Sequence, residues 1–236
     1  MKDFSLILPT HNHPALVRRL FDSIIRTTSN LDQLEIVLYL DSDDEESRNI
    51  SHPFLHMVKL VKHPDTMGNM LRAGYAASQA RYVMPINDDM LFCTEDWDTK
   101  VLKAFSRFSD DAAMVYGNDL YYGRMICTFP ILSRMACELM NKICPAEYKW
   151  HCIDAHIFDI FKRLSQLGYK RALYLGNVIF EHMHHELSAA INDSELEPNS
   201  DTDDQELYFS LAQDRQRIAL RMAEYIKDRK GELCKP

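Results

Sequence analysis

The sequence has no two cysteines in the C-x-x-C spacing. Its six cysteines are scattered over 236 residues, so they do not form the dense framework of a disulfide-rich domain. The spacing argues against a zinc knuckle and against a thioredoxin-like redox site. We therefore expect reduced thiols, as in a cytosolic protein.

Long apolar runs and runs of basic residues are also missing. No stretch approaches the roughly 20 apolar residues of a membrane span, and the apolar run near the N-terminus has the length of a strand, shorter than a signal-peptide core. The formal net charge is −8, with a pI of about 5.7. A protein that holds a polyanion by charge needs a basic face, so nucleic acid is disfavoured as a partner without being excluded. These features predict a cytoplasmic protein without a transmembrane segment.

The residues that are present suit a globular α/β domain. Hydrophobic residues make up 46% of the chain and charged residues 26%, enough for a sizeable core. Short apolar runs alternate with helical patterns over the first half, which predicts a mostly parallel sheet covered on both faces. The predicted strands are 4–10, 35–40, 57–61, 81–87 and 113–117, and the predicted helices start at Pro14 and cover 68–79 and 97–108.

The second half of the sequence is less regular. Helices are expected over 133–143 and 154–167, and a strand over 172–181. Residues 192–206 are acidic and nearly devoid of apolar side chains, which predicts a mobile loop. A long amphipathic helix is then expected over roughly 207–229.

Carboxylates follow two predicted strands at the point where each strand ends. Asp41, Asp43 and Asp44 follow the second strand, and Asp88 and Asp89 follow the fourth. Ligands of open parallel sheets bind beyond the carboxyl ends of the strands. Because like charges repel, two such clusters favour a divalent cation, and Mg²⁺ and Mn²⁺ prefer oxygen ligands. A solvated turn is the simpler alternative, since Asp is a common turn residue.

Three of the ten histidines lie in the stretch 182–185, directly after the predicted strand 172–181. In a strand, His182 and His184 would point to the same side. Imidazole binds Mn²⁺-class and softer metals. An exposed, polar strand end is the alternative interpretation.

Asp154 stands where the predicted helix 154–167 begins. This position fits a helix N-cap, which is a common role of Asp. It also fits a general base, which needs a rigidly held carboxylate near the group it deprotonates, and a helix start favours the charged form. Asp159 lies further along the helix and is expected to be solvated.

The motifs, in this order, resemble those of the GT-A-fold glycosyltransferases, and most closely the inverting glycosyltransferase family 2 group. The resemblance covers about residues 4–185. SLILPTHNHPALVRRLFDSI resembles the first strand and helix of that family, with its Pro-Thr-x-Asn element at Pro9, Thr10 and Asn12. LYLDSDD resembles the second strand, whose terminal Asp contacts the nucleotide base in the family. That residue is Asp41 here.

The Asp-x-Asp metal motif of the family falls on Asn87, Asp88 and Asp89, so an amide replaces its first carboxylate. The resemblance assigns the metal to Asp89 and a donor contact to Asp88. CIDAHIFDIFKRLSQLGYK resembles the segment that carries the catalytic base, usually Glu-Asp before a helix. Ile153 replaces the Glu, and Asp154 matches the base.

NVIFEHMHH resembles the following strand of the family, whose histidine completes the metal site. His182 is the better match, and His184 is the alternative. Arg72 is a further candidate for a contact with the nucleotide or its phosphates.

The resemblance implies an α/β fold of the GT-A (Rossmann-like) type, a mostly parallel central sheet flanked by helices, with an extra C-terminal helix. Residues 1–190 would form the glycosyltransferase domain, with a nucleotide-sugar-binding half at about 1–118 and an acceptor and catalytic half at about 119–190. Residues 191–236 would form an acidic loop and an amphipathic helix packed on the same domain. Within them, 192–206 would be either a linker or a lid that orders over the donor.

The resemblance also implies the reaction. A sugar passes from a nucleoside diphosphate, most commonly uridine diphosphate (UDP), to an acceptor hydroxyl with inversion of configuration. Mn²⁺ or Mg²⁺, held by Asp89 and His182 or His184, offsets charge on the leaving diphosphate, and Asp154 removes the acceptor proton. The acceptor stays open between a glycan, a lipid-linked sugar, a protein side chain and a modified nucleobase.

Three other functions remain open on the sequence alone. A sugar-phosphate nucleotidyltransferase usually needs a glycine-rich, basic first loop, whereas PTHNHP contains neither glycine nor lysine. A non-catalytic nucleotide-sugar-binding protein would fit the departures at Asn87 and Ile153. A His/Asp metal hydrolase would draw its ligands from several loops and bind no nucleotide.

Overall fold

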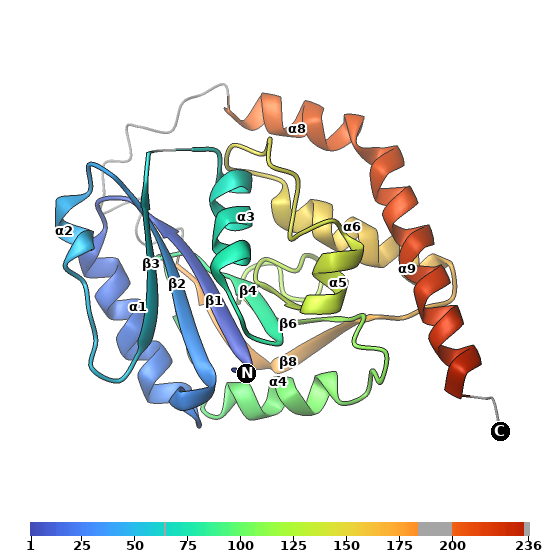
Figure 1. Ribbon diagram of the computed structural model, residues 1–236, viewed down its shortest axis with the longest axis horizontal. Helices are drawn as coiled ribbons and strands as arrows, with labels where there is room; N and C mark the ends of the chain where they lie inside the picture. The colour runs from blue at the N-terminus through green and yellow to red at the C-terminus, as the bar shows by residue number, and fades with distance from the viewer. Residues whose placement is uncertain (64, 184–199, 234–236) are drawn as a thin grey trace.

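An eight-stranded sheet forms the centre of the molecule (Figure 1). The structure is a computed structural model that describes residues 1–63, 65–183 and 200–233. Along the sheet the strands follow the order β3 (His56–Lys62), β2 (Leu34–Asp41), β1 (Phe4–Thr10), β4 (Tyr82–Pro85), β7 (Pro130–Ser133), β6 (Met114–Asn118), β8 (Ala172–His182) and β5 (Met90–Phe92).

Most neighbouring strands run parallel. β1 pairs in parallel with β2 and β4, β2 with β3, and β6 with β8. β7 runs antiparallel to both β4 and β6, and β5 runs antiparallel to β8. The predicted α/β fold with a mostly parallel sheet is therefore confirmed. The sequence analysis missed β5 and β7, because three or four residues are too short for a recognisable alternation.

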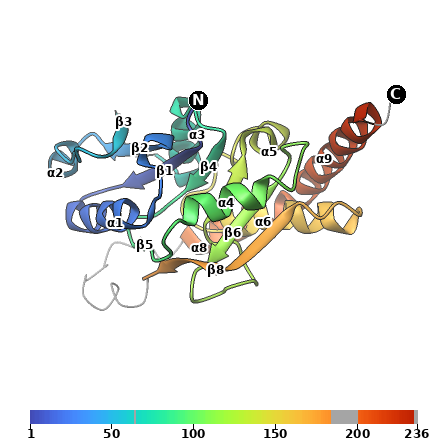
Figure 2. The same ribbon diagram turned by 90° about the horizontal axis from the view of Figure 1, so that it is seen from below.

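Helices cover both faces of the sheet. α1 (Pro14–Thr27) and α4 (Trp97–Phe105) share one apolar core with the sheet. The other core contains α3 (Met67–Ala77), α5 (Arg134–Leu139), α6 (Ile153–Gln166) and α9 (Ala212–Leu233). The remaining described helices are η1 (Leu31–Gln33), α2 (Glu45–Arg48) and α8 (Ser200–Ser210). In Figures 1 and 2, α2 and α9 lie at opposite ends of the molecule.

β1 is buried on both faces, as its apolar sequence predicts. Leu6 and Leu8 belong to the core with α1 and α4, whereas Ile7 belongs to the core with α3. Gly74 allows α3 to lie directly against β1, because a Cβ there would lie 2.4 Å from Cγ2 of Ile7. This contact holds α3 against the strand whose end carries Thr10.

Local signals set where the helices begin and end. Pro14 occupies the first turn of α1, where a missing N–H costs nothing. The Thr66 hydroxyl caps α3 by accepting a backbone hydrogen bond. Beyond α5, Asn141 and Lys142 have φ angles of 61° and 86°. These left-handed residues end the helix early, so the helix expected over 133–143 is shorter than predicted.

α9 packs on α6 through an ion pair as well as apolar contacts. Arg215 is 2% exposed, and its Nε donates to Oδ2 of Asp159 at 2.6 Å. Arg163 donates to the same oxygen at 2.7 Å. Asp159 was expected to be solvated, and that expectation is wrong. Its place between two arginines depends on a helix more than 50 residues away in the chain, which helical periodicity cannot show. Three apolar residues of α9 are fully buried in the same core: Ala219, Met222 and Ile226.

The described part of the acidic segment 192–206 is helical. Residues 200–206 belong to α8, so the loop prediction is wrong there, and 192–199 lie outside the described residues. The helix expected over 207–229 lies across α8 and α9. α8 is fastened to the domain by Asp204, which is 1% exposed and accepts three backbone hydrogen bonds, and by Leu207 and Tyr208, which pack on the core.

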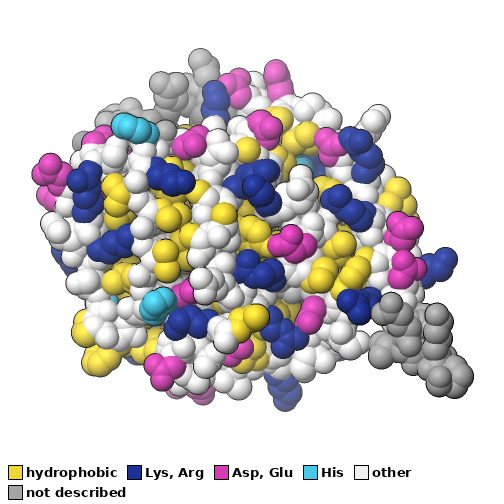
Figure 3. All heavy atoms as spheres, in the orientation of Figure 1, with side chains coloured by type: hydrophobic (Ala, Val, Ile, Leu, Met, Phe, Trp, Pro, Cys, Tyr) yellow, Lys and Arg dark blue, Asp and Glu magenta, His cyan; other side chains and the backbone are white. Residues whose placement is uncertain are grey.

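The described surface and thiols agree with the composition. Five cysteines are described, and all are free thiols. None of the helices within the described ranges is long and apolar enough to cross a bilayer. On the face shown in Figure 3, Lys and Arg side chains are dispersed among acidic and apolar ones and do not form one basic stripe.

Candidate active site

The carboxyl ends of β1, β2 and β4 meet at one edge of the sheet. β1 lies between β2 and β4, so the order of strands along the chain reverses next to β1. Open sheets bind ligands at such a point. Thr10 ends β1, Asp41 ends β2, and Asp88 follows β4. The Thr10 hydroxyl donates to Oδ2 of Asp88 at 2.6 Å, so one hydrogen bond joins the two strand ends across the reversal.

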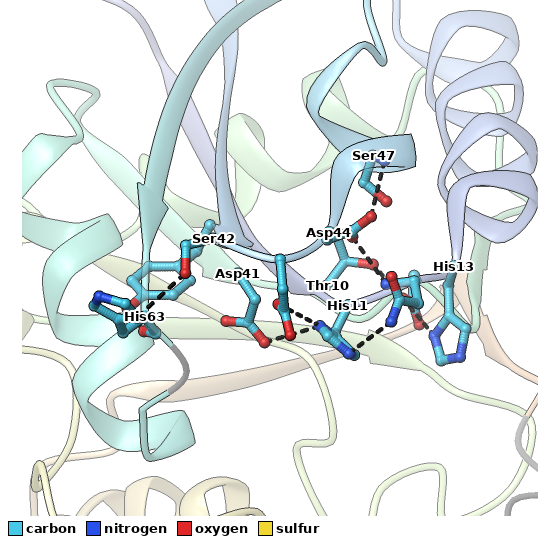
Figure 4. Close-up of polar contacts among 12 residues, drawn as sticks. Thr10, His11, His13, Asp41, Ser42, Asp44, Ser47 and His63 are labelled. Carbon is cyan, nitrogen blue, oxygen red and sulfur yellow. Dashed lines mark hydrogen bonds and ion pairs between the residues drawn. The ribbon is translucent and has the colours of Figure 1, made fainter.

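Asp44 fastens the loop after β1 to the loop after β2 (Figure 4). Its Oδ2 accepts from the backbone N–H of Asn12 at 2.8 Å, and its Oδ1 accepts from that of Ser47 at 2.9 Å, which caps α2. Burial by itself raises the pKa of Asp44, but these hydrogen bonds outweigh it and hold the pKa below the ordinary value. Asn12 adopts φ 55° in this turn. Pro9 is buried beside Tyr39 of β2 and shapes the end of β1.

His11, Asp41 and Asp43 form the first group that could hold a cation. Their candidate ligand atoms lie within 4.8 Å of one another. His11 Nδ1 lies 3.0 Å from Oδ2 of Asp41 and 3.8 Å from Oδ1 of Asp43, whose side chain is 70% exposed. Burial raises the pKa of Asp41, and the nearby His11 only partly offsets that rise. The sequence analysis did not single out His11 as a ligand, because only the fold places it beside Asp41.

Asp89 and His182 form the second group: Asp89 directly precedes β5, and His182 ends the antiparallel β8. The backbone N–H of Met183 donates to the carbonyl oxygen of Asp89 at 2.9 Å, which sets the register. Nε2 of His182 then lies 3.2 Å from Oδ2 of Asp89. The other carboxylate oxygen of Asp89, Oδ1, is buried and has no hydrogen-bond partner among the described residues. Buried polar atoms are normally satisfied, so an unpaired carboxylate oxygen beside an imidazole fits a divalent metal ion.

The charges around His182 show which residues gather there. Burial alone would lower the pKa of His182. The hydrogen bond to Asp89 and the negative charges of Asp89, Asp119 and Asp154 outweigh burial, so the pKa lies above its ordinary value. Asp89, Asp154 and His182 are 65 and 28 residues apart in the chain. In the fold, His182 contacts Asp89, and Asp154 lies near enough for its charge to act on the imidazole.

Asp154 is the second residue of α6 and does not cap the helix. The N-cap is Cys152, with φ 64°, so the predicted cap is wrong: the left-handed conformation of Cys152 lets the helix start at Ile153, one residue before Asp154. Oδ1 of Asp154 accepts from the N–H of Ala155 at 2.7 Å. Burial raises the pKa of Asp154, and this hydrogen bond and His182 offset the rise only in part. The residue as a whole is partly exposed.

α8 holds the segment that leads into α6. Asp204 accepts backbone hydrogen bonds from Lys149 at 2.9 Å, Trp150 at 2.8 Å and His151 at 2.7 Å. On the other side, the N–H of Gly68 in α3 donates to a carbonyl oxygen of the same segment, that of Tyr148, at 2.9 Å. The segment before Asp154 is thus clamped between α3 and α8.

Asp204→Ala is expected to lower the free energy of unfolding by roughly 2 kcal/mol, because three N–H groups lose their acceptor. For a chain of this size the melting temperature should fall by roughly 5 °C. Asp203→Ala is the matched control, since Asp203 makes only an exposed ion pair with Lys149, worth at most about 1 kcal/mol. Equal melting temperatures for the two variants would show that the clamp does not stabilise the fold.

Two other candidates have structural partners. Arg72 donates to the carbonyl oxygen of Cys144 at 3.2 Å, so its guanidinium at least partly supports the loop after α5. The carboxylate of Asp119 accepts from three backbone N–H groups and from Thr128, which makes it a loop anchor. His184 lies outside the described residues. A hollow of about 730 Å³ at the amino ends of the strands, lined in part by Lys2 and Glu35, contains none of these residues.

The strand order reverses next to β1, as it does in nucleotide-binding α/β sheets, and acidic residues lie at the carboxyl edge there. These features define the class as a GT-A-fold glycosyltransferase. The comparison with protein families agrees with the geometry. The chain belongs to glycosyl transferase family 2, whose model matches residues 5–151. This membership decides against a nucleotidyltransferase and a metal hydrolase. The match ends before Asp154 and His182, so their roles depend on the geometry described above.

Solved structures show the same fold. The mannosyltransferase PcManGT from Pyrobaculum calidifontis has a TM-score of 0.61 at 16% identity, with 93% of this chain and 73% of that chain covered. TarS 1–349 from S. aureus has a TM-score of 0.57 at 14% identity, with 78% and 61% covered. Glucosyl-3-phosphoglycerate synthase from Mycobacterium tuberculosis has a TM-score of 0.53 at 14% identity, with 80% and 74% covered. No curated protein matches the chain significantly.

Proposed function

We propose that the protein transfers a sugar from a UDP-sugar to an acceptor hydroxyl with inversion, in a reaction that depends on Mn²⁺ or Mg²⁺. The convergence of Asp89, His182 and Asp154 at the carboxyl edge of the sheet carries this proposal. Two groups are suited to a cation that faces a diphosphate, and the third is a carboxylate suited to proton removal.

The donor nucleotide is placed at the ends of β1, β2 and β4. Oδ1 of Asp41 is buried and has no hydrogen-bond partner among the described residues. It would accept a hydrogen bond from the nucleotide base. Thr10, Asn12 and Asp88 would line the ribose and diphosphate, with Pro9 shaping the strand end and Arg72 in reach only if it leaves Cys144. PcManGT was solved with GDP-Man and Mn²⁺, TarS with UDP-GlcNAc, and glucosyl-3-phosphoglycerate synthase with UDP and Mn²⁺. These ligands support a nucleotide-sugar donor, and we favour UDP as the commonest carrier.

The metal is assigned to Asp89 and His182, with His184 as the alternative imidazole. This pair is preferred to the group of His11, Asp41 and Asp43 for two reasons. Asp43 is mostly exposed, and Asp41 is assigned to a hydrogen bond with the nucleotide base. A bound divalent cation supplies charge neutralisation for the leaving diphosphate. Asp89, just before β5, and His182, at the end of β8, would hold that charge at the carboxyl edge of the sheet.

Asp154 is assigned as the base for the acceptor hydroxyl. It lies in the second half of the chain, and we propose that residues 1–118 bind the donor while 119–190 bind the acceptor and complete the site. Residues 191–236 would support that half through the contacts of α8 and α9 with the segment 149–151 and α6. A glycan, a lipid-linked sugar, a protein side chain or a modified nucleobase each presents the hydroxyl that this arrangement needs.

Thermal stabilisation tests the donor assignment. UDP and UDP-sugars with Mn²⁺ are expected to raise the melting temperature, because a ligand at 100 times its Kd adds about 2.7 kcal/mol to the free energy of unfolding. GDP, GDP-sugars and adenosine diphosphate serve as comparisons. Stabilisation by a guanosine nucleotide alone would reject UDP as the donor carrier, and no stabilisation by any of them would reject the nucleotide site.

A further inference from the structure

The loop between β6 and β7 exposes a group of large apolar side chains. Four residues are between 45% and 76% exposed, and we call them the loop patch: Leu120, Tyr121, Tyr122 and Met125. The two tyrosine rings lie 4.5 Å apart at an interplanar angle of 87°. Exposed apolar groups of this size usually mark a surface that binds something.

Hydrogen bonds to the buried side chain of Asp119 fix the conformation of the loop that carries the patch. Asp119 is 3% exposed, and its Oδ1 accepts from the N–H groups of Tyr121, Tyr122 and Gly123 at 2.7–3.0 Å. Its Oδ2 accepts from the Thr128 hydroxyl at 2.6 Å, which closes the base of the loop. Both tyrosines make these contacts through their backbone N–H groups, so the fold fixes the backbone that carries the two rings. A preformed loop loses little conformational entropy when it binds.

Both ends of the loop touch residues of the proposed active site. At its start, the carbonyl oxygen of Asp119 accepts from the N–H of His182 at 3.2 Å. At its end, the Cys127 thiol lies 3.6 Å from the carbonyl oxygen of Asp154, and the Phe129 ring packs on His182 with centroids 5.3 Å apart. The loop that carries the patch is therefore anchored at both ends on His182 and Asp154 of the proposed active site.

The loop lies on the side of the site away from the nucleotide. β7 is antiparallel to both β4 and β6, so β6 ends at the same edge of the sheet as β4. In the strand order, β6 lies beyond β4 and β7, whereas β1 and β2 lie on the opposite side of β4. With the nucleotide base of the donor at Asp41, the β6 side of the site remains open for the acceptor.

We propose that the loop patch binds a sugar ring of a saccharide acceptor, with Tyr121 and Tyr122 as its platform. The proposal rests on the proposed glycosyl transfer and names its acceptor class. A sugar ring combines apolar C–H faces with hydroxyl edges, and tyrosine combines an apolar ring with a polar tip, so the two match in both respects. An anionic lipid surface would call for several clustered basic side chains. The loop has only Arg124, whose guanidinium lies over the Tyr174 ring, 5.4 Å from its centroid.

The experiment uses the full chain with Mn²⁺, the donor that stabilises it and a panel of p-nitrophenyl glycosides as acceptors. We expect at least one glycoside to be extended, and Tyr122→Ala to raise its KM by about tenfold, the effect of losing one aromatic contact. The kcat, the slow hydrolysis of donor by water and the affinity for UDP should change less than about twofold, because the platform touches only the acceptor. Tyr122→Phe should retain most of the affinity, since it keeps the ring.

Phe54→Ala is the matched control. Phe54 is 66% exposed but lies just before the amino end of β3, at the opposite edge of the sheet, so the glycoside KM should not move. Unchanged KM in both Tyr121→Ala and Tyr122→Ala would overturn the platform. Transfer to serine peptides or to lipid vesicles, with no glycoside accepted, would overturn the saccharide assignment while donor hydrolysis still supported the glycosyltransferase. Absence of both donor binding and hydrolysis would reject the proposed function, and this inference with it.

Discussion

Asp89→Ala is expected to reduce metal-dependent donor turnover by more than about 100-fold. The substitution removes both carboxylate oxygens, including the buried Oδ1 that has no hydrogen-bond partner in the described part of the protein. His182 alone would then hold the cation, and one imidazole is a poor site for Mn²⁺ or Mg²⁺. The Mn²⁺-assisted gain in UDP affinity should be lost, while UDP binding in EDTA should stay as it is in the unsubstituted protein. Isothermal titration of UDP with and without Mn²⁺ measures both.

Asp43→Ala provides the control that separates the two candidate cation groups. Asp43 belongs to the group with His11 and Asp41, whose ligand atoms lie within 4.8 Å of one another. Its loss should leave the Mn²⁺ dependence near that of the unsubstituted protein. The reverse outcome, with Asp43→Ala losing Mn²⁺ dependence and Asp89→Ala keeping it, would move the metal to the His11 group. Full turnover in EDTA would contradict metal dependence altogether.

The strand ends were predictable because strands have a simple sequence pattern. Each apolar run of the first half stops at a polar residue, and parallel strands place those residues at one edge. This reasoning predicted that the carboxylates after the second and fourth predicted strands, Asp41 and Asp88 among them, would lie at one edge of the sheet. The same reasoning did not predict that His11 and His13 lie at this edge, because a histidine after a strand has no distinctive spacing. In the structure, His13 Nδ1 lies 3.2 Å from Oδ2 of Asp88. The catalytic and binding roles of these residues remain predictions.

Contacts made by buried charges could not be predicted from the sequence. Asp204 stands in an acidic stretch of the chain and Asp159 on an amphipathic helix, and solvation is the usual expectation for an aspartate. In the fold, the Asp204 carboxylate accepts hydrogen bonds from three backbone N–H groups, and the Asp159 carboxylate accepts from two arginine side chains. The partners of Asp204 and the Arg215 partner of Asp159 lie more than 50 residues away in the chain, whereas Arg163 is only four residues from Asp159. Hydrophobic periodicity reports which residues avoid water, and it carries no information about such partners.

Asp154→Asn is expected to lower kcat by about 10²-fold or more, because an amide cannot take up the acceptor proton. The affinities for UDP and Mn²⁺ should remain near those of the unsubstituted protein, since Asp154 touches neither in the proposed arrangement. Stability should change by less than about 1 kcal/mol. The amide oxygen can still accept from the N–H of Ala155, and the lost negative charge in the first helical turn is worth only about 0.3–1 kcal/mol. Steady-state transfer rates, UDP titration and thermal unfolding measure the three effects.

Asp159→Asn should show the opposite pattern, and this contrast makes the test decisive. Asp159 lies five residues further along α6, where it pairs with Arg163 and the buried Arg215. Removing its charge leaves the Arg215 guanidinium poorly compensated, which should cost roughly 3 kcal/mol of stability, while kcat of the protein that stays folded should change little. If Asp154→Asn instead melts early and keeps its rate, Asp154 is structural. Asp119 cannot replace it as the base without giving up its loop contacts, so Glu181, which faces Cys93 at 3.5 Å, would be the next residue to test.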